Sequence, residues 1–448
     1  MTEHRPSIDP TDARLRRWMH EEAPAAAPDA ILRSVNAAAR HTRQQRFGLG
    51  WLPLVAAAAA IVAIAAYGTT VSLRSGEEPP GSAASVDASP PAPASNAAPS
   101  SPSASAPADG PWPRATVELP ADNSSRMHAV ASGRDGLVAV GGGGSIEGFG
   151  GALAWHSVDG QSWALTVDRH AERDGSQMSD VVATVSGFVA VGDNPDGVPV
   201  WLSADGRSWR EADAASAPRA PDHALTAIAV AGDELLAIGF ASEDDQQIAT
   251  LWTSVNGAAW TRLGVPGTFA GAWPRDIAAT EDGTAVIVGM TEPGSGDPIA
   301  WVARGGTVEE PVRLPSDDPE AVVGVVVATP TGYTALGSGW EPGRANYLPL
   351  AWRSADGRAW EPVEPDAIGF ILGAAFIADR GVVAVGQTAG LESSDVVAWD
   401  LADEGAWRTI LLEHSNGAGF GVVERPAGGL VIVGSDDPDG SAVVWLEP

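Results

Sequence analysis

The sequence predicts an all-β fold over residues 112–448, a closed seven-bladed β-propeller of four-stranded blades. Two observations carry this prediction. A block of 46 to 51 residues recurs seven times. Each copy contains short strands with period-2 alternation and a turn between them, as in VVATVSGFVAVG at 181–192. Repeats of this length with four strands are typical of propeller blades.

Three markers identify the copies. A glycine ends the second strand of each copy, at Gly141, Gly192, Gly239, Gly289, Gly337, Gly386 and Gly434. A tryptophan opens the second half of each copy, at Trp155, Trp201, Trp252, Trp301, Trp352, Trp399 and Trp445. A marker tryptophan follows eight residues later in five copies, at Trp163, Trp209, Trp260, Trp360 and Trp407. The fourth copy lacks it and has Val308 nearby.

The two ends of the repeat region complement each other. The last copy stops at VVWLEP, where its fourth strand should begin, and PWPRATVELP stands before the first copy. Trp112 precedes Gly141 by 29 residues, as Trp163 precedes Gly192. We therefore expect residues 112–118 to form the outer strand of the last blade, which would close the ring and remove an open edge. An open solenoid is the alternative.

The stretch SADGRSW at 203–209 predicts a tight turn between the third and fourth strands of the second blade. Asp-Gly and Asn-Gly favour such turns, and Ser and Asp side chains accept hydrogen bonds from turn N–H groups. The motif occurs four times, whereas a catalytic site is needed once. We assign a structural role to the turn residues Ser157, Asp159, Gly160, Ser203, Asp205, Gly206, Ser254, Asn256, Gly257, Ser354, Asp356 and Gly357.

These motifs resemble the Asp-box, or BNR, repeat of sialidase-like propellers, whose pattern is Ser-x-Asp-x-Gly-x-Thr-Trp. The resemblance covers residues 112–448 and implies a propeller with the box on the hairpin between the third and fourth strands. Asp and Gly are adjacent here, so the box is one residue short, and Ser or Ala replaces Thr. Kelch-type propellers are the nearest alternative family.

The resemblance also implies a sialidase-like exo-glycosidase as an alternative function. Such enzymes use a tyrosine nucleophile, a partnering carboxylate and an arginine cluster. Tyr67 lies in an apolar run and Tyr333 in a strand, which leaves Tyr347. Its loop between the second and third strands offers a ligand-contacting group of Trp340, Glu341, Arg344 and Tyr347. A solvated loop is the alternative, and no spacing in it specifies a reaction.

The corresponding loops of other blades are acidic, and the last blade has Asp436, Asp437 and Asp439. Carboxylates this close could bind Ca²⁺, although none follows the EF-hand pattern, and a charged rim that keeps the domain soluble is the alternative. No other cofactor is expected. The histidines, His128 among them, are scattered, and no metalloprotease or serine-hydrolase motif is present.

Residues 54–73 form a run of 20 residues without a charge, the length that a helix needs to cross a bilayer. We predict a transmembrane helix at 50–74, since the segment before the run is too long for a signal peptide's n-region. Arg40, Arg43 and Arg46 precede it. The positive-inside rule therefore predicts a single-pass protein of the cytoplasmic membrane, with a cytoplasmic N-terminus and an extracytoplasmic propeller.

The remaining segments flank this span. Residues 1–49 contain two predicted short helices, which are too small for a core of their own. Residues 11–45 therefore either lie on the membrane or bind a cytoplasmic protein partner. The layout resembles that of membrane-anchored anti-sigma regulators. Residues 75–111 are rich in Ala, Ser and Pro and predict a disordered tether.

Charge and composition exclude some functions. Residues 75–448 hold 18 Arg against 51 Asp and Glu, which disfavours binding to nucleic acid. The chain has no cysteine, which excludes disulfides and zinc-thiolate sites. We predict a bacterial, membrane-anchored, non-catalytic binding or scaffolding module with an extracytoplasmic protein or glycan ligand. The alternatives are the exo-glycosidase and a transmembrane signalling regulator with the propeller as sensor.

Overall fold

A computed structural model gives the structure of the propeller. It describes residues 111–121, 124–143, 150–169, 175–195, 197–213, 217–218, 223–243, 246–264, 267–292, 295–341, 346–363, 367–388, 394–401, 407–437 and 440–448. The predicted cytoplasmic segment, transmembrane helix and tether lie outside these residues. In the part of the chain that is described, no helix has the length and apolar character needed to cross a membrane.

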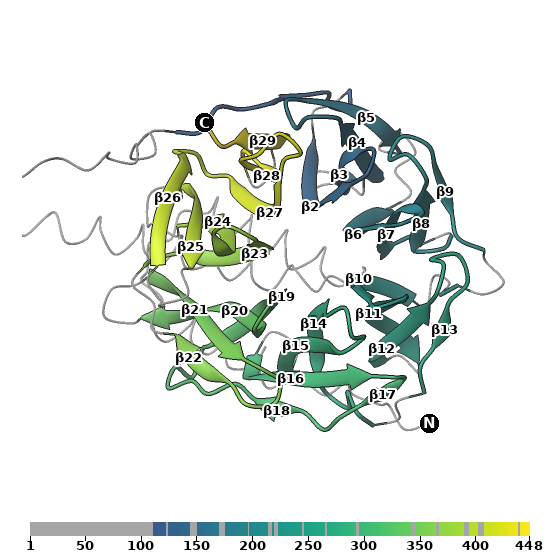
Figure 1. Ribbon diagram of the computed structural model, residues 1–448, viewed down its shortest axis with the longest axis vertical. Coiled ribbons are helices and arrows are strands. Elements are labelled where there is room, and N and C mark those ends of the chain that lie inside the picture. Colours follow the sequence, from purple (N-terminus) through teal and green to yellow (C-terminus); the bar gives the residue numbers. More distant parts are fainter. Residues whose placement is uncertain are drawn as a thin grey trace, which may run out of the picture. The chain divides into compact units, whose positions relative to one another are not determined.

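The predicted seven-bladed β-propeller is confirmed. Seven sheets stand around a central axis, and the chain adds one blade after another around the ring (Figure 1). Within a typical blade the strands follow one another outward, as in the order β10-β11-β12-β13. Antiparallel neighbours joined by short turns need no crossover connection, which suits a repeat of this length.

The strands occupy four positions from the axis to the rim. The innermost strands are β2 (Ser125–Gly133), β6 (Gln177–Thr184), β10 (His223–Ala231), β14 (Trp273–Ala279), β19 (Val322–Thr329), β23 (Phe370–Ile377) and β27 (Ala418–Glu424). The second strands are β3 (Gly136–Gly143), β7 (Gly187–Asp193), β11 (Glu234–Glu243), β15 (Ala285–Glu292), β20 (Gly332–Glu341), β24 (Gly381–Gln387) and β28 (Leu430–Ser435).

A third strand lies outside these two in every blade, and an outer strand follows in six of the seven. The third strands are β4 (Ala152–Ser157), β8 (Val200–Ser203), β12 (Gln246–Ser254), β16 (Ser295–Arg304), β21 (Asn346–Ser354), β25 (Val396–Leu401) and β29 (Ala442–Leu446). The outer strands are β5 (Ser162–Asp168), β9 (Trp209–Glu211), β13 (Thr261–Arg262), β17 (Thr307–Val308), β22 (Glu361–Val363) and β26 (Trp407–Glu413), and β18 (Val312–Arg313) also pairs with β16.

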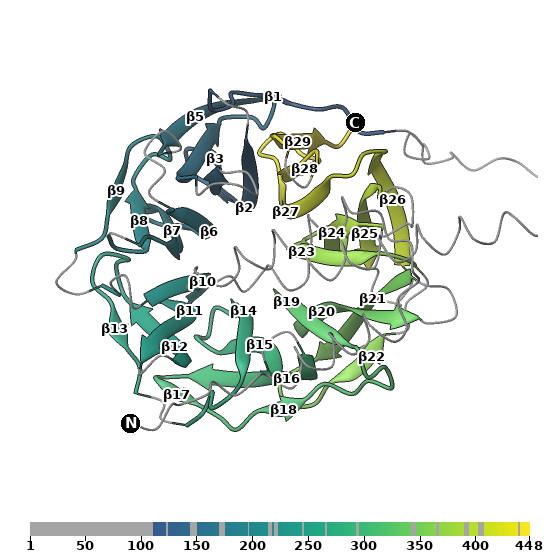
Figure 2. The same cartoon turned by 180° about the vertical axis from the view of Figure 1, so that it is seen from behind.

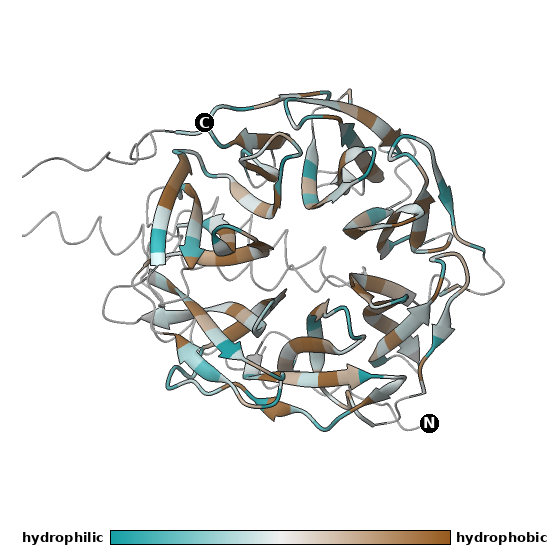
Figure 3. Cartoon of the chain, in the orientation of Figure 1, coloured by the Kyte–Doolittle hydropathy of each residue, from teal (hydrophilic) through white to brown (hydrophobic). Residues whose placement is uncertain are grey.

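The hydrophobic core lies between the blades. Hydrophobic and polar residues alternate along many strands (Figure 3), and the buried apolar side chains form seven clusters. Each cluster takes residues from two adjacent blades, and one joins Val431 of the last blade to Leu137 of the first. The same packing thus joins every pair of neighbouring blades. The largest fully buried side chains include Trp155, Trp301, Trp352, Trp399 and Trp445.

The N-terminal segment begins on the last blade. The N–H of Ala115 donates to the carbonyl of Val444 at 2.8 Å, and that of Leu446 donates to the carbonyl of Pro113 at 2.9 Å. Trp112 is buried in the cluster between the sixth and seventh blades. Marker tryptophans of other blades occupy the same kind of position, between their own blade and the preceding one.

The segment then leaves the last blade. The strand β1 (Thr116–Val117) pairs in parallel with β5 at the rim of the first blade (Figure 2). The prediction that all of residues 112–118 belong to the last blade is therefore wrong for this part. The physical reason is the edge of β5, where the carbonyls of Gln161 and Trp163 accept the N–H groups of Thr116 and Glu118 at 2.9 Å.

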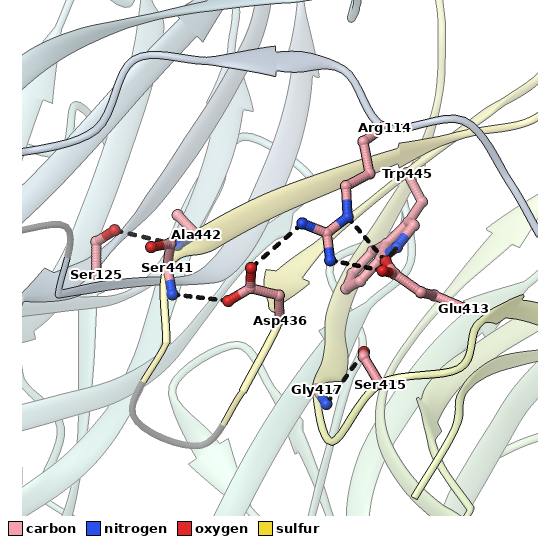
Figure 4. Close-up of polar contacts among 9 residues, drawn as sticks. All are labelled: Arg114, Ser125, Glu413, Ser415, Gly417, Asp436, Ser441, Ala442 and Trp445. Atoms are coloured by element: carbon pink, nitrogen blue, oxygen red, sulfur yellow. Dashed lines mark hydrogen bonds and ion pairs between the residues drawn. The ribbon is translucent and has the colours of Figure 1, made fainter.

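Arg114 sits at the centre of this junction (Figure 4). Its Nη2 donates to Glu413 Oε1 at 2.6 Å and its Nε to Glu413 Oε2 at 2.9 Å. Its Nη1 lies 3.2 Å from Asp436 Oδ2. Glu413 Oε2 also accepts the indole N–H of Trp445 at 2.6 Å. One network thus ties the N-terminal segment to the sixth and seventh blades.

Candidate functional site

Every innermost strand carries a β-bulge near its first residues. In β2 the pairing with β3 shifts between Met127 and Ala129, which makes His128 the extra residue. The same shift occurs in the other six blades. A bulge leaves its extra residue outside the ladder and re-aims its side chain. The bulge ring, as we name these seven half-buried residues, consists of His128, Ser179, Thr226, Arg275, Gly324, Leu372 and Phe420.

The repeat glycine of each second strand lies opposite the bulge. Gly141 pairs with Met127, and a side chain at Gly141 would collide with the backbone carbonyl of Arg126. Gly337 has the same relation to the carbonyl of Val322. The five other repeat glycines also face an inner-strand carbonyl in this way. The glycine that marks the repeat in the sequence is therefore required by the bulge.

The bulge ring differs from blade to blade, whereas the glycine and tryptophan positions repeat. Its members include a cation, an imidazole, two hydroxyl groups and two large apolar side chains. A position whose residue type varies in this way is not specified by the repeated blade structure alone. The bulge ring is therefore the candidate recognition surface of the propeller.

His128, Phe420 and Arg126 meet where the last blade adjoins the first. The rings of His128 and Phe420 lie edge to face with 6.4 Å between their centroids. The guanidinium carbon of Arg126 lies 5.5 Å from the centre of the Phe420 ring. Burial, followed by the charge of Arg126, lowers the pKa of His128 to about 4. The imidazole is therefore neutral at neutral pH, and its Nδ1 lies 2.9 Å from the carbonyl oxygen of Met178.

Two aspartates directly follow bulge residues and connect neighbouring inner strands. Oδ2 of Asp180 accepts the N–H of Ile228 at 2.9 Å, and Oδ2 of Asp276 accepts the N–H of Val326 at 2.8 Å. Burial raises the pKa of Asp180 to about 6 and that of Asp276 to about 7. In mildly acidic solution both carboxyl groups are therefore largely neutral and do not repel an anion.

Arg275 is the cation of the bulge ring. Its Nε is fully buried and has no hydrogen-bond partner among the described residues. Burial lowers the pKa of its guanidinium group. A buried polar group without a hydrogen bond is costly, so an acceptor that reached this Nε would stabilise it. Arg275 and Arg126 lie at the same end of the inner strands β14 and β2.

The structure brings together only part of the predicted loop group on the fifth blade. Trp340 and Tyr347 face each other across β20 and β21, with 5.0 Å between their ring centroids. A third aromatic residue, Phe370, was not part of the predicted group. The centroid of its ring lies 5.4 Å from that of Tyr347. The side chain of Glu341 and the whole of Arg344 lie outside the described residues. Burial raises the pKa of Tyr347, which disfavours a phenolate nucleophile.

The predicted turn residues lie in hairpin turns and make local hydrogen bonds. In the second blade Ser203 Oγ accepts the N–H of Gly206 at 2.8 Å, and Asp205 Oδ1 accepts the N–H groups of Arg207 and Ser208. These hydrogen bonds lower the pKa of Asp205, and the bond from the N–H of Ser208 has the largest effect. The indole N–H of Trp209 donates to the carbonyl of Gly206 at 3.2 Å.

The other three hairpins repeat this arrangement. A serine Oγ accepts a glycine N–H at 2.8 to 2.9 Å in the pairs Ser157 and Gly160, Ser254 and Gly257, and Ser354 and Gly357. The adjacent Asp159, Asn256 and Asp356 accept turn N–H groups in the same way. All four turn carboxylates or amides are thus engaged with their own backbone.

The acidic loop of the last blade is partly engaged in the junction network. Asp436 contacts Arg114, and its Oδ1 accepts the N–H of Ser441 at 2.9 Å. Asp439 lies outside the described residues, while Asp437 lies within them. Among the residues that are described, no group of three or more His, Asp or Glu side chains is arranged to hold a metal ion.

No protein-family model matches the chain. No curated protein sequence matches it either. Among solved structures, a virginiamycin B lyase from Staphylococcus aureus is similar over 73% of this chain and 96% of its own, with 7% identity and a TM-score of 0.48. A streptogramin B lyase is similar over 75% of this chain and 97% of its own, with 7% identity and a TM-score of 0.47. An ulvan polysaccharide lyase is similar over 56% of this chain and 74% of its own, with 11% identity and a TM-score of 0.37. Likenesses of this strength carry no information on activity.

The bulge ring was not found by sequence reasoning. Its members share no residue type, so no motif marks them. A signal exists nevertheless, since each bulge residue stands 13 or 14 positions before the repeat glycine of its blade. Reading the residues at that spacing from Gly141 and Gly289 would have found His128 and Arg275.

Proposed function

We propose that the protein is a membrane-anchored, extracytoplasmic binding module that recognises a carboxylate-bearing ligand at the bulge ring. The observation that carries this proposal is Arg275, whose buried Nε has no hydrogen-bond partner among the described residues. Guanidinium groups are well suited to carboxylates because they offer paired donors in a fixed geometry. Arg126, at the same end of the inner strands, adds a second cation.

The surroundings support an anion despite the acidic composition of the chain. Asp180 and Asp276 directly follow bulge residues on the inner strands, and their raised pKa values reduce their charge in mildly acidic solution. His128 and Phe420 provide an uncharged edge and an aromatic face beside Arg126. Sites that combine apolar side chains with a few placed polar groups are typical of ligand binding.

Anchoring and the Asp-box relationship belong to the same proposal. The uncharged run at 54–73 and the arginines before it support a single span with the propeller outside the cytoplasm. The repeated serine and aspartate turn bonds support the interpretation of the hairpin motifs as shortened Asp-boxes. The raised pKa of Tyr347 is the reason that we propose binding rather than glycoside cleavage.

Binding of defined probes to the full-length protein in detergent micelles tests the proposal. The probes are an oligogalacturonate, an oligoglutamate peptide and a neutral maltooligosaccharide, which separate a carboxylated glycan from an acidic protein segment. Wild type should bind one of the anionic probes, and Arg275→Gln should weaken that binding by about tenfold or more. Arg210→Gln, on an exposed side chain of an outer strand, is the matched control and should bind like wild type. Equal binding by Arg275→Gln and wild type would contradict the proposal, as would binding of the neutral probe alone.

A further inference from the structure

The fourth blade differs from the others at the hairpin between its third and fourth strands. In the second blade Ser203 pairs with the marker tryptophan Trp209, and in the sixth Leu401 pairs with Trp407. The equivalent pair in the fourth blade is Ala303 and Val308. Val308 therefore occupies the register position of the marker tryptophan, on a hairpin one residue shorter.

The tight packing of this hairpin against the preceding blade is also lost. In four blades a side chain on the glycine of this hairpin turn would come within 2.5 to 2.8 Å of a valine on the preceding blade. The pairs are Gly160 and Val431, Gly206 and Val138, Gly257 and Val189, and Gly357 and Val286. Each of these valines stands three residues before a repeat glycine. Leu236 is the equivalent residue facing the fourth blade. A side chain on Gly305 would meet no described atom within 4 Å, and one on Gly306 only Leu263 at 3.9 Å.

A groove of about 250 Å³ lies at this place, between the third and fourth blades. Leu236, Leu263 and Ala303 supply its apolar part, and Glu234, Asp282 and Arg304 its charged part. It is formed by the turns that follow the inner and third strands. Since the bulges lie near the beginning of the inner strands, the groove is at the opposite end of the blades from the bulge ring.

The size and chemistry of the groove fit one aromatic side chain. Its volume is below the roughly 300 to 1,000 Å³ of most small-molecule sites. In four other blades a tryptophan of the chain occupies the equivalent position and donates its indole N–H to the carbonyl three residues before it, as Trp260 does to Gly257 at 2.7 Å. In the fourth blade the carbonyl at that position belongs to Gly305.

The charges indicate what flanks such a side chain. Arg304 is paired with Asp282 at 3.2 Å, so its charge is already balanced. The carboxylate of Glu234 accepts a hydrogen bond from the hydroxyl group of Thr253 at 3.1 Å. The structure describes no other contact of this carboxylate. The groove is therefore acidic by about one charge, which complements a basic residue next to the aromatic ring.

We propose that this groove is a docking site for a protein partner that inserts a tryptophan side chain flanked by an arginine or lysine. The partner's indole takes the position that a marker tryptophan of this chain fills in five other blades. A single aromatic anchor in a well-packed pocket commonly dominates the affinity of a protein interface. The site is independent of the carboxylate-binding function proposed for the bulge ring.

Fluorine NMR of a dipeptide probe tests the proposal. The probe is acetyl-5-fluorotryptophyl-arginine amide, and the full-length protein in micelles is titrated against it beside empty micelles. We expect line broadening with wild type that unlabelled acetyl-tryptophyl-arginine amide reverses and acetyl-alanyl-arginine amide does not. Val308→Trp restores a marker tryptophan on the hairpin that lines the groove and should weaken probe binding by about tenfold or more. Glu234→Gln should weaken it by about two- to fivefold.

Val185→Trp is the matched control, because it adds a tryptophan at a fully exposed turn on another blade. It should bind the probe like wild type. Broadening no greater than that in empty micelles overturns the proposal, and so does unchanged binding by either Val308→Trp or Glu234→Gln. If Val308→Trp fails to fold by circular dichroism, the decision rests on Glu234→Gln, an exposed substitution expected to leave the fold intact.

Discussion

The guanidinium group of Arg114 binds the carboxylate of Glu413 through two hydrogen bonds, at 2.6 and 2.9 Å, across 299 residues of sequence. Glu413 ends the outer strand of the sixth blade, and the same carboxylate accepts the indole N–H of Trp445 on the seventh. The junction of the ring is thus held by a polar network in addition to the apolar packing found between all blades (Figure 4).

Removal of Glu413 should weaken the junction more than removal of Arg114. Glu413→Ala leaves the buried indole N–H of Trp445 without its acceptor, which costs about 1 to 3 kcal/mol. Arg114→Ala breaks a partly exposed ion pair, worth about 1 kcal/mol or less. Glu413→Gln keeps an acceptor for Trp445 and should fall between the two. Urea unfolding of the three variants measures the order, and a larger loss from Arg114→Ala would show that the ion pair dominates.

Ser203 and Asp205 should contribute to stability through the turn alone. Ser203→Ala leaves the buried N–H of Gly206 without its acceptor and should cost about 1 to 2 kcal/mol. Asp205→Ala should cost less, because its carboxylate is exposed. Asp205→Asn should be close to neutral, since Asn256 makes the same two turn bonds in the third blade at 2.9 Å. Thermal melts measure these effects. A strong loss from Asp205→Asn would indicate a role for the charge itself.

Two glycines of the fifth blade should differ in their response to alanine. Gly337→Ala places a methyl group against the carbonyl of Val322, which should cost about 2 kcal/mol or more. Gly324→Ala, at the bulge, meets no described atom within 4 Å and should stay within about 0.5 kcal/mol of wild type. Urea midpoints of the two variants decide the matter. Equal losses would mean that the repeat glycine is not required by the bulge.

The blades could be predicted from the sequence because each marker residue meets one local structural requirement. A glycine is required opposite every bulge, and a large apolar ring fills the space between neighbouring blades. These needs recur seven times, so they appear as a repeat. The prediction of seven blades rested on Gly141 and its six equivalents, and the structure gives each of them the same neighbour, a backbone carbonyl of the inner strand.

Features that occur once had no such signal. The parallel pairing of Thr116 with Ser162 depends on which free strand edge lies next to the chain as it crosses the junction, and no residue pattern encodes that. The bulge ring depends on a register shift between two strands, while its residues are free to differ. Tyr347 stands out in the sequence as a rare residue type, and its ring neighbours among the described residues are Trp340 and Phe370.

The buried carboxyl group of Asp276 should make the protein less stable as the pH rises. Its pKa is raised from 3.8 to about 7, chiefly by burial. Between these values the folded state keeps a proton that the unfolded chain has lost, so the stabilisation is fully present below about pH 4 and disappears as the pH passes about 7. Asp276→Asn keeps an amide oxygen for the N–H of Val326 and removes the titration. Its urea midpoint should exceed that of wild type at about pH 8 and approach it at about pH 4.

His128, whose pKa is lowered to about 4, gives the opposite slope, but it does so in both proteins. The difference between them therefore reports Asp276 together with its repulsion of the Asp180 carboxylate, and a difference that stays constant across this range would show that Asp276 does not titrate within it.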